Sequence, residues 1–215
     1  MRKALLLLAL LGCSDDNKSS PPVDAAPPID TATAPLALDC NTYCTRLAAD
    51  CTGTNAQLSM ANCMGACAAF PPGTQADQSG NTLGCRNYHL QNIEVRNMSA
   101  TVHCPHTGPV GGLIDPAATT VCGTSACDDF CAMEAKVCGT DASPVAGVTN
   151  RYATTAACMT ACAGFTKTPE ASPNVQSGNN FACRIYHLTN AAAGAAPGTN
   201  AHCGHTLSPA TGVCI

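Results

Sequence analysis

The pattern of apolar and polar residues divides this chain into three parts. An apolar run comes first, a polar stretch without a periodic apolar face follows, and the rest has residues at helical spacing. An unbroken apolar run, Ala4–Leu11, directly follows the basic residues Arg2 and Lys3. The run is too short to cross a bilayer but has the length of the apolar region of a signal peptide, which we place at residues 1–12. Residues 13–39 are rich in Ser, Pro, Ala and Asp and have no periodic apolar face. Such a segment buries too little apolar surface to offset chain entropy, so it predicts a disordered linker.

After the linker, cysteines recur at helical spacing. At about 100° per residue, Cys40, Cys44 and Cys51 fall on one face of a helix. Cys63 and Cys67 lie four residues apart and share a face of a second helix. The sequence therefore predicts two short helices, each with a face that carries cysteines.

A third helix is predicted after these two. Ser79-Gly80-Asn81 has the composition of a turn and N-cap, and we expect the helix to run through Leu90. Cys85 and His89 are four residues apart on it and share a face. The next block, His103-Cys104-Pro105-His106-Thr107, lies among Pro, Gly and Thr residues and is predicted to be a loop.

The whole pattern occurs twice. The blocks Cys-Met-x-x-Cys, Gln-Ser-Gly-Asn and Cys-Arg-x-Tyr-His-Leu recur in the same order, and spacings vary only between blocks, where surface loops are expected. We therefore predict two tandem repeats, at residues 40–123 and 124–215. The matched cysteines are Cys40, Cys44, Cys51, Cys63, Cys67, Cys85, Cys104 and Cys122, then Cys127, Cys131, Cys138, Cys158, Cys162, Cys183, Cys203 and Cys214.

Disulfides are expected to stabilise each repeat. The chain has four Phe, four Tyr and no Trp, and a core this small and light is marginal alone. Four disulfides per repeat would each add about 2–4 kcal/mol, in the oxidising compartment that an export signal implies. The predicted fold class is therefore a small, disulfide-rich, mainly α protein with long loops. Eight cysteines per repeat allow many pairings, and the sequence does not choose among them.

Two antiparallel helices that each carry Cys-x3-Cys resemble the plant α-hairpinin motif, in which the outer pair and the inner pair are bridged. The resemblance implies the pairs Cys40–Cys67, Cys44–Cys63, Cys127–Cys162 and Cys131–Cys158. It leaves open the partners of Cys51, Cys85, Cys104, Cys122, Cys138, Cys183, Cys203 and Cys214. As whole modules, the repeats resemble cysteine-rich repeats of Gram-negative lipoproteins, and this resemblance brings no activity with it.

One cysteine has no counterpart in either repeat. Cys13 ends the sequence Leu10-Leu11-Gly12-Cys13, which resembles the bacterial lipobox. The resemblance implies cleavage before Cys13 and a diacylglycerol on its thiol; a second acyl chain would make membrane attachment stable. Ser14 follows, in place of the Asp that retains many such lipoproteins at the inner membrane, so the resemblance implies the outer membrane of a Gram-negative bacterium. An ordinary secretory peptide with a chance cysteine is the alternative.

The histidines are the candidate metal ligands. Each repeat has one on the third helix and two in the following block: His89, His103 and His106, then His187, His202 and His205. Three imidazoles can hold Zn²⁺ or Cu²⁺ and leave one coordination position open. Met64 and Met159 would add a thioether, which favours copper. The alternative is a structural role in capping or packing, and the lack of a matched Asp or Glu to orient an imidazole favours it.

No catalytic signature was found. The chain has no Cys-x-x-Cys, no haem-attachment motif, no phosphate loop after a strand and no matched carboxylate pair. Loss of Arg2 and Lys3 changes the formal net charge from −4 to −6, which argues against nucleic acid as a partner. We therefore expect a lipid-anchored cell-envelope protein, not an enzyme, with a structural or binding role towards an unidentified protein or surface ligand. A metal-binding protein with one three-histidine site per repeat, for Cu or Zn, is the alternative.

Overall fold

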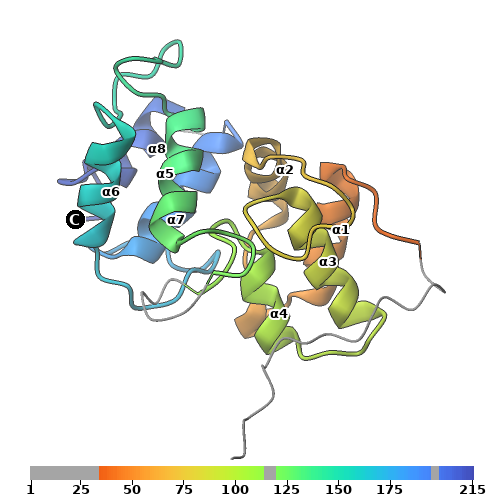
Figure 1. The fold of residues 1–215 in the computed structure, drawn as a ribbon. Coiled ribbons are helices and arrows are strands. Elements are labelled where there is room, and N and C mark those ends of the chain that lie inside the picture. The colour runs from red at the N-terminus through yellow and green to blue at the C-terminus, as the bar shows by residue number, and fades with distance from the viewer. Residues whose placement is uncertain (1–33, 114–119, 195–198) are drawn as a thin grey trace, which may run out of the picture. The chain divides into compact units, whose positions relative to one another are not determined.

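The computed structural model describes residues 34–113, 120–194 and 199–215. These residues form eight α-helices and one 3₁₀-helix, and their β structure is limited to one bridge between Gly139 and Pro144, which confirms the predicted fold class. The predicted signal peptide, Cys13 and most of the predicted linker lie outside the described residues. The helices, which Figure 1 shows in two groups, α1–α4 and α5–α8, are α1 (Cys40–Asp50), η1 (Gly53–Asn55), α2 (Met60–Ala69), α3 (Leu83–Glu94), α4 (Ala100–Thr107), α5 (Ala126–Val137), α6 (Thr155–Ala163), α7 (Phe181–Ala192) and α8 (Thr199–Thr206).

Side-chain caps fix where most of these helices begin. In each case a short polar side chain accepts the backbone N–H of the residue three positions on, which satisfies one of the unpaired donors of the first turn. The third helix of each repeat begins just after its Gln-Ser-Gly-Asn block and, in the first repeat, runs past Leu90 to Glu94. The capping residues are Asp39, Ser59, Thr82, Ser125, Thr154 and Asn180.

Eight disulfides join the helices, and each connects two cysteines of the same repeat. Two bridges hold α1 to α2 and two hold α5 to α6, in the pairs that the α-hairpinin resemblance implied. The remaining bridges tie the end of the first helix to the fourth, and the third helix to the segment that closes the repeat. The pairs are Cys40–Cys67, Cys44–Cys63, Cys51–Cys104, Cys85–Cys122, Cys127–Cys162, Cys131–Cys158, Cys138–Cys203 and Cys183–Cys214.

The histidine blocks are helical, so their prediction as loops was wrong. α4 and α8 contain these blocks, and Pro105 lies in the last turn of α4. The Cys51–Cys104 bridge holds α4 from one side, and the Tyr43 hydroxyl donates to the carbonyl of Thr107 at 2.6 Å. These tertiary contacts override a weak local helix propensity. The consequence is that the two histidines of each block lie on a packed helix.

A buried arginine fastens the third helix to the segment after the fourth. Arg86 is fully buried, donates to the carbonyl of Gly108 at 3.0 Å, and stacks its guanidinium 3.8 Å from the ring centre of Phe70. Arg184 stacks in the same way on Phe165 in the second repeat. These arginines therefore have a packing role.

The folded part begins before Cys40. Residues 34–39, which the sequence assigned to the linker, lie along α3, where Asn87 donates to the carbonyl of Ala37 at 2.9 Å. Leu36 packs against the hydrophobic core. Short extended segments become ordered in this way when side chains of a neighbouring helix satisfy their carbonyls.

The two repeats contact each other through α2, which packs on α7 and α5. Asn62 donates to the hydroxyl of Thr189 at 3.4 Å. Gly65 approaches α7 so closely that a Cβ there would lie 2.4 Å from the backbone of Ala192.

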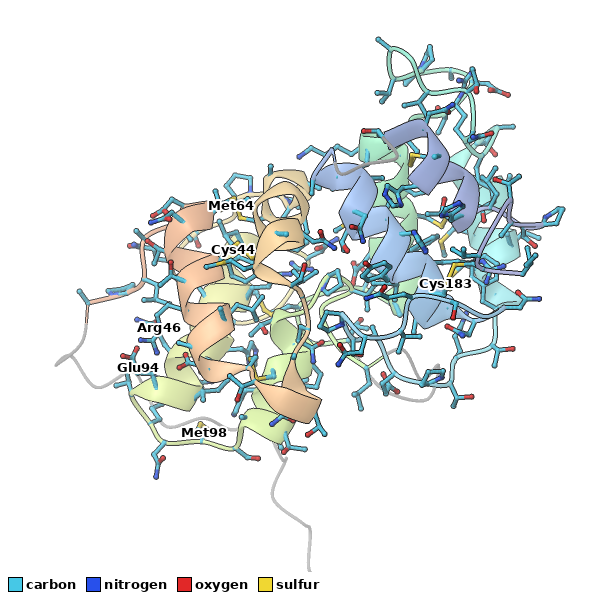
Figure 2. The ribbon with its side chains drawn as sticks, turned by 180° about the vertical axis from the view of Figure 1, so that it is seen from behind. Cys44, Arg46, Met64, Glu94, Met98 and Cys183 are labelled. Atoms are coloured by element: carbon cyan, nitrogen blue, oxygen red, sulfur yellow. A yellow bond between two sulfur atoms is a disulfide. The ribbon has the colours of Figure 1, made fainter. Side chains whose placement is uncertain are left out.

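On another part of the first repeat, an ion pair joins α1 to α3 between Arg46 and Glu94, which Figure 2 shows next to each other. None of the described helices has both the length and the apolar character needed to cross a membrane.

Candidate metal centre

Three imidazoles meet in the second repeat. His187 comes from α7, and His202 and His205 come from α8, which packs against it. The Nδ1 atom of His187 lies 2.9 Å from Nδ1 of His202 and 3.1 Å from Nδ1 of His205. All three histidines offer ligand atoms within 4.8 Å of one another. The site lies beside the Cys183–Cys214 bridge, of which Figure 2 labels Cys183.

A backbone carbonyl fixes the orientation of the central imidazole. Nε2 of His187 lies 3.1 Å from the carbonyl oxygen of Gln176, which belongs to the Gln-Ser-Gly-Asn block. A carbonyl only accepts hydrogen bonds, so Nε2 must carry the hydrogen. In a neutral imidazole the lone pair then lies on Nδ1, the atom that faces the other two histidines. A hydrogen bond from the second ring nitrogen is the usual way in which proteins orient a metal-binding histidine.

A single two-centre hydrogen bond does not account for both contacts of His187 Nδ1. Nδ1 of His187 has one lone pair, which can accept one hydrogen bond from one direction. It nevertheless has two nitrogen neighbours at hydrogen-bond distance, in His202 and His205. A cation placed among the three Nδ1 atoms would satisfy all of them. With Zn–N bonds of about 2.0–2.1 Å, tetrahedral ligands lie about 3.3 Å apart, so a small opening of the cluster would accommodate the ion.

Burial keeps the central imidazole neutral. His187 and His202 are buried, whereas His205 is partly exposed. Burial, together with the neighbouring His205 and His202, lowers the pKa of His187 to about 4, against the opposing effect of the Gln176 carbonyl. Burial also lowers the pKa of His205. Metal ions bind the neutral form of imidazole, so the environment favours the form that a metal requires.

The first repeat has the same scaffold but a different histidine geometry. Nδ1 of His89 lies 2.9 Å from Nδ1 of His103, and the carbonyl of Gln78 lies 3.4 Å from its Nε2. This single close contact is explained by one hydrogen bond from His103 to His89. The ring centre of His106 is 4.8 Å from that of His89 and 6.2 Å from that of His103, each 0.4 Å longer than the matched distances of 4.4 and 5.8 Å from His205 to His187 and His202. Of the two histidine sets, only the second brings three ligand atoms within 4.8 Å of one another in the described residues.

Burial also affects the first set. Together with the nearby His106 and His103, it lowers the pKa of His89 to about 3. His89 and His103 are both buried, as their counterparts in the second repeat are. The two sets therefore share their burial and their supporting carbonyl and differ in the position of the third ring.

The sulfur-containing candidates do not join these sets as thiolates. Cys85 and Cys122 lie close to His89, but they are bridged to each other, and Cys183 and Cys214 are bridged beside His187. Oxidised sulfur is not a thiolate ligand. Met64 is 48% exposed on α2, and Met159 packs against the core from α6. The proposal that either methionine adds a thioether stays without support.

The sequence identified the residues of the site but not the features that orient them. All six histidines were candidate metal ligands, because they occur at matched positions in the two repeats. Their orienting group was sought among Asp and Glu side chains, whereas the structure supplies a main-chain carbonyl at Gln78 and Gln176. The repeated Gln-Ser-Gly-Asn block was the available signal, and it was interpreted only as a turn.

Comparison with known proteins gives one partial match. Residues 28–122 match the BfoA family C-terminal domain, a stretch that ends at the last cysteine of the first repeat and covers less than half of the chain. No curated protein and no solved structure matches the sequence. The match and the eight disulfides describe a cysteine-rich protein that is similar, over its first repeat, to the BfoA family C-terminal domain.

Proposed function

We propose that the second repeat binds one divalent transition-metal ion, Zn²⁺ or Cu²⁺, through the Nδ1 atoms of His187, His202 and His205. The observation that carries the proposal is the double contact of His187 Nδ1, at 2.9 and 3.1 Å, on an atom whose single lone pair is fixed by the Gln176 carbonyl. From sequence alone, a structural or binding role without metal came first. Because the three nitrogens converge, we place metal binding ahead of a role without metal.

The ligand set defines the kind of ion. Three neutral imidazoles suit Zn²⁺ and Cu²⁺, and for the same nitrogen ligands Cu²⁺ is generally bound more tightly than Zn²⁺. Three protein ligands leave at least one coordination position for water or another small ligand. His205 is the partly exposed ligand, so this position is reached most directly from its side. The proposed role is metal binding in the cell envelope, without a proposed reaction.

Metal titration tests the proposal, with a matched variant from the first repeat as its control. Full-length protein with intact disulfides is stripped of metal and titrated with Zn²⁺ against a chromophoric chelator. We expect about one tightly bound ion per chain. His187→Ala should abolish this binding, whereas His89→Ala, the same change at the matched position, should preserve it. Absence of binding in the wild type, or an equal loss in both variants, would contradict the proposal.

The location proposed for this site is a lipid-anchored one. The eight disulfides are typical of an oxidising, extracytoplasmic compartment. The lipobox resemblance at Cys13 supports attachment to a membrane through acyl chains, and Ser14 after it supports the outer membrane. The linker would then hold the folded repeats away from the lipid surface.

A further inference from the structure

We infer that Gly212 is a positioning residue that holds the third ligand, His205, in the histidine cluster. This inference rests on the proposed metal site and names a residue outside its ligand set. Gly212 belongs to the segment that follows α8 and is closed by the Cys183–Cys214 bridge. None of the motifs that the two repeats share pointed to this glycine.

Gly212 combines close contact with an unusual backbone conformation. Its φ is +98°, a region that residues with a side chain rarely adopt. A Cβ at this position would lie 2.6 Å from Nε2 and 2.8 Å from Cδ2 of His205. The glycine therefore contacts the ring edge opposite the Nδ1 atom that meets His187. An added methyl group would displace the imidazole, because a ring at the end of a side chain moves more easily than packed backbone.

The first repeat has no glycine at the matched position. Two residues before the closing cysteine, the second repeat has Gly212 and the first has Thr120. The neighbouring valines keep matched contacts, since the carbonyl of Val121 accepts from Gly80 and that of Val213 accepts from Gly178.

The two closing segments are therefore held at matched points and differ in the residue at the position of Gly212. Only the repeat with the glycine brings its third histidine into the cluster in the described residues.

A simple loss of loop stability is the competing explanation, and the chain offers a control for it. Gly147 also has a positive φ, +77°, but a Cβ there would have no neighbour within 4 Å. Gly147→Ala thus introduces similar backbone strain in the same repeat without contact to a histidine. A second comparison uses His205→Ala, because a residue that acts only through His205 should have no further effect once that imidazole is absent.

The experiment measures Zn²⁺ affinity and the visible absorption of bound Co²⁺ in the full-length protein. Gly212→Ala should weaken Zn²⁺ binding by about 10- to 100-fold and change the Co²⁺ spectrum towards that of His205→Ala. Gly147→Ala should leave both unchanged. The double variant His205→Ala, Gly212→Ala should bind no more weakly than His205→Ala alone. Circular dichroism and thiol titration of each variant check that the helices and disulfides are intact.

The outcomes separate this inference from the metal site itself. If the wild type binds neither ion, the proposed function fails and this inference fails with it. If the wild type binds and Gly212→Ala retains its affinity and spectrum, the metal site stands and the inference is wrong. Equal weakening by Gly147→Ala, or further weakening in the double variant, would show that Gly212 acts through general stability and would also overturn the inference.

Discussion

Glu134 occupies the buried helix position in the second repeat that Leu47 occupies in the first. Its Oε1 accepts a hydrogen bond from Thr206 at 3.2 Å, while its other oxygen is buried without a hydrogen-bond partner. Burial raises the pKa of Glu134 to about 8, against a smaller opposing effect of the Thr206 hydroxyl. Tyr152 is close enough for the two groups to influence each other's ionisation. The second repeat thus carries a buried acid at a position that the first fills with an aliphatic residue.

This acid should make stability depend on pH. Below about pH 4.5 the side chain is protonated in both states; as pH rises to about 8, the unfolded chain loses the proton while the folded protein keeps it. The free energy of unfolding should therefore fall across this window. Glu134→Gln should leave stability nearly unchanged at pH 4 and increase it at pH 8, as measured by denaturant unfolding with the disulfides intact. An equal effect at both values would argue against a buried, ionising carboxyl.

At the scale of elements, the sequence predicted best the helices whose cysteines lie four apart. α1, α2, α5 and α6 were expected from this spacing, because a shared helix face is a local property. α4 and α8 were missed because what holds them is distant in sequence: the bridge from Cys51 to Cys104, and the hydroxyl of Tyr43 on Thr107. For the same reason, His187 could be identified as a candidate ligand from the sequence, but the carbonyl eleven residues earlier that orients it could not.

The α2–α7 contact gives a prediction at this scale. Gly65 faces the backbone of α7, whereas Thr160, at the matched position of the second repeat, is exposed. Gly65→Ala should gain about 1 kcal/mol of helix propensity but lose more through overpacking, so we expect a net loss of roughly 1–3 kcal/mol in denaturant unfolding. Thr160→Ala should change stability by less than about 0.5 kcal/mol. A stabilised Gly65→Ala variant would mean that α2 and α7 are not in close contact in solution.

At the scale of the whole molecule, the anchor is the feature that the described residues do not include. If Cys13 carries the lipid, Cys13→Ala should move the protein from the membrane fraction to the soluble fraction or leave its leader uncleaved, because the acyl chains are the attachment. Cell fractionation and mass spectrometry of the amino terminus measure both results, and Ser14→Ala should remain at the membrane. A Cys13→Ala protein that is processed normally and still partitions with membranes would show that the anchor lies elsewhere.

The eight covalent bridges have a consequence for how a bound ion would be exchanged. In zinc fingers the ion supplies the folding energy, so its loss unfolds the domain. Here Cys183–Cys214 ties α7 to the closing segment and Cys138–Cys203 ties α8 to the end of α5, with or without a ligand. Binding and release of the ion would therefore not require the chain to refold. The rates of both steps would depend on how easily the ion passes the side chain of His205. If the proposed metal site and location hold, a centre built in this way would act as a reservoir whose occupancy follows the concentration of free metal outside the cell membrane.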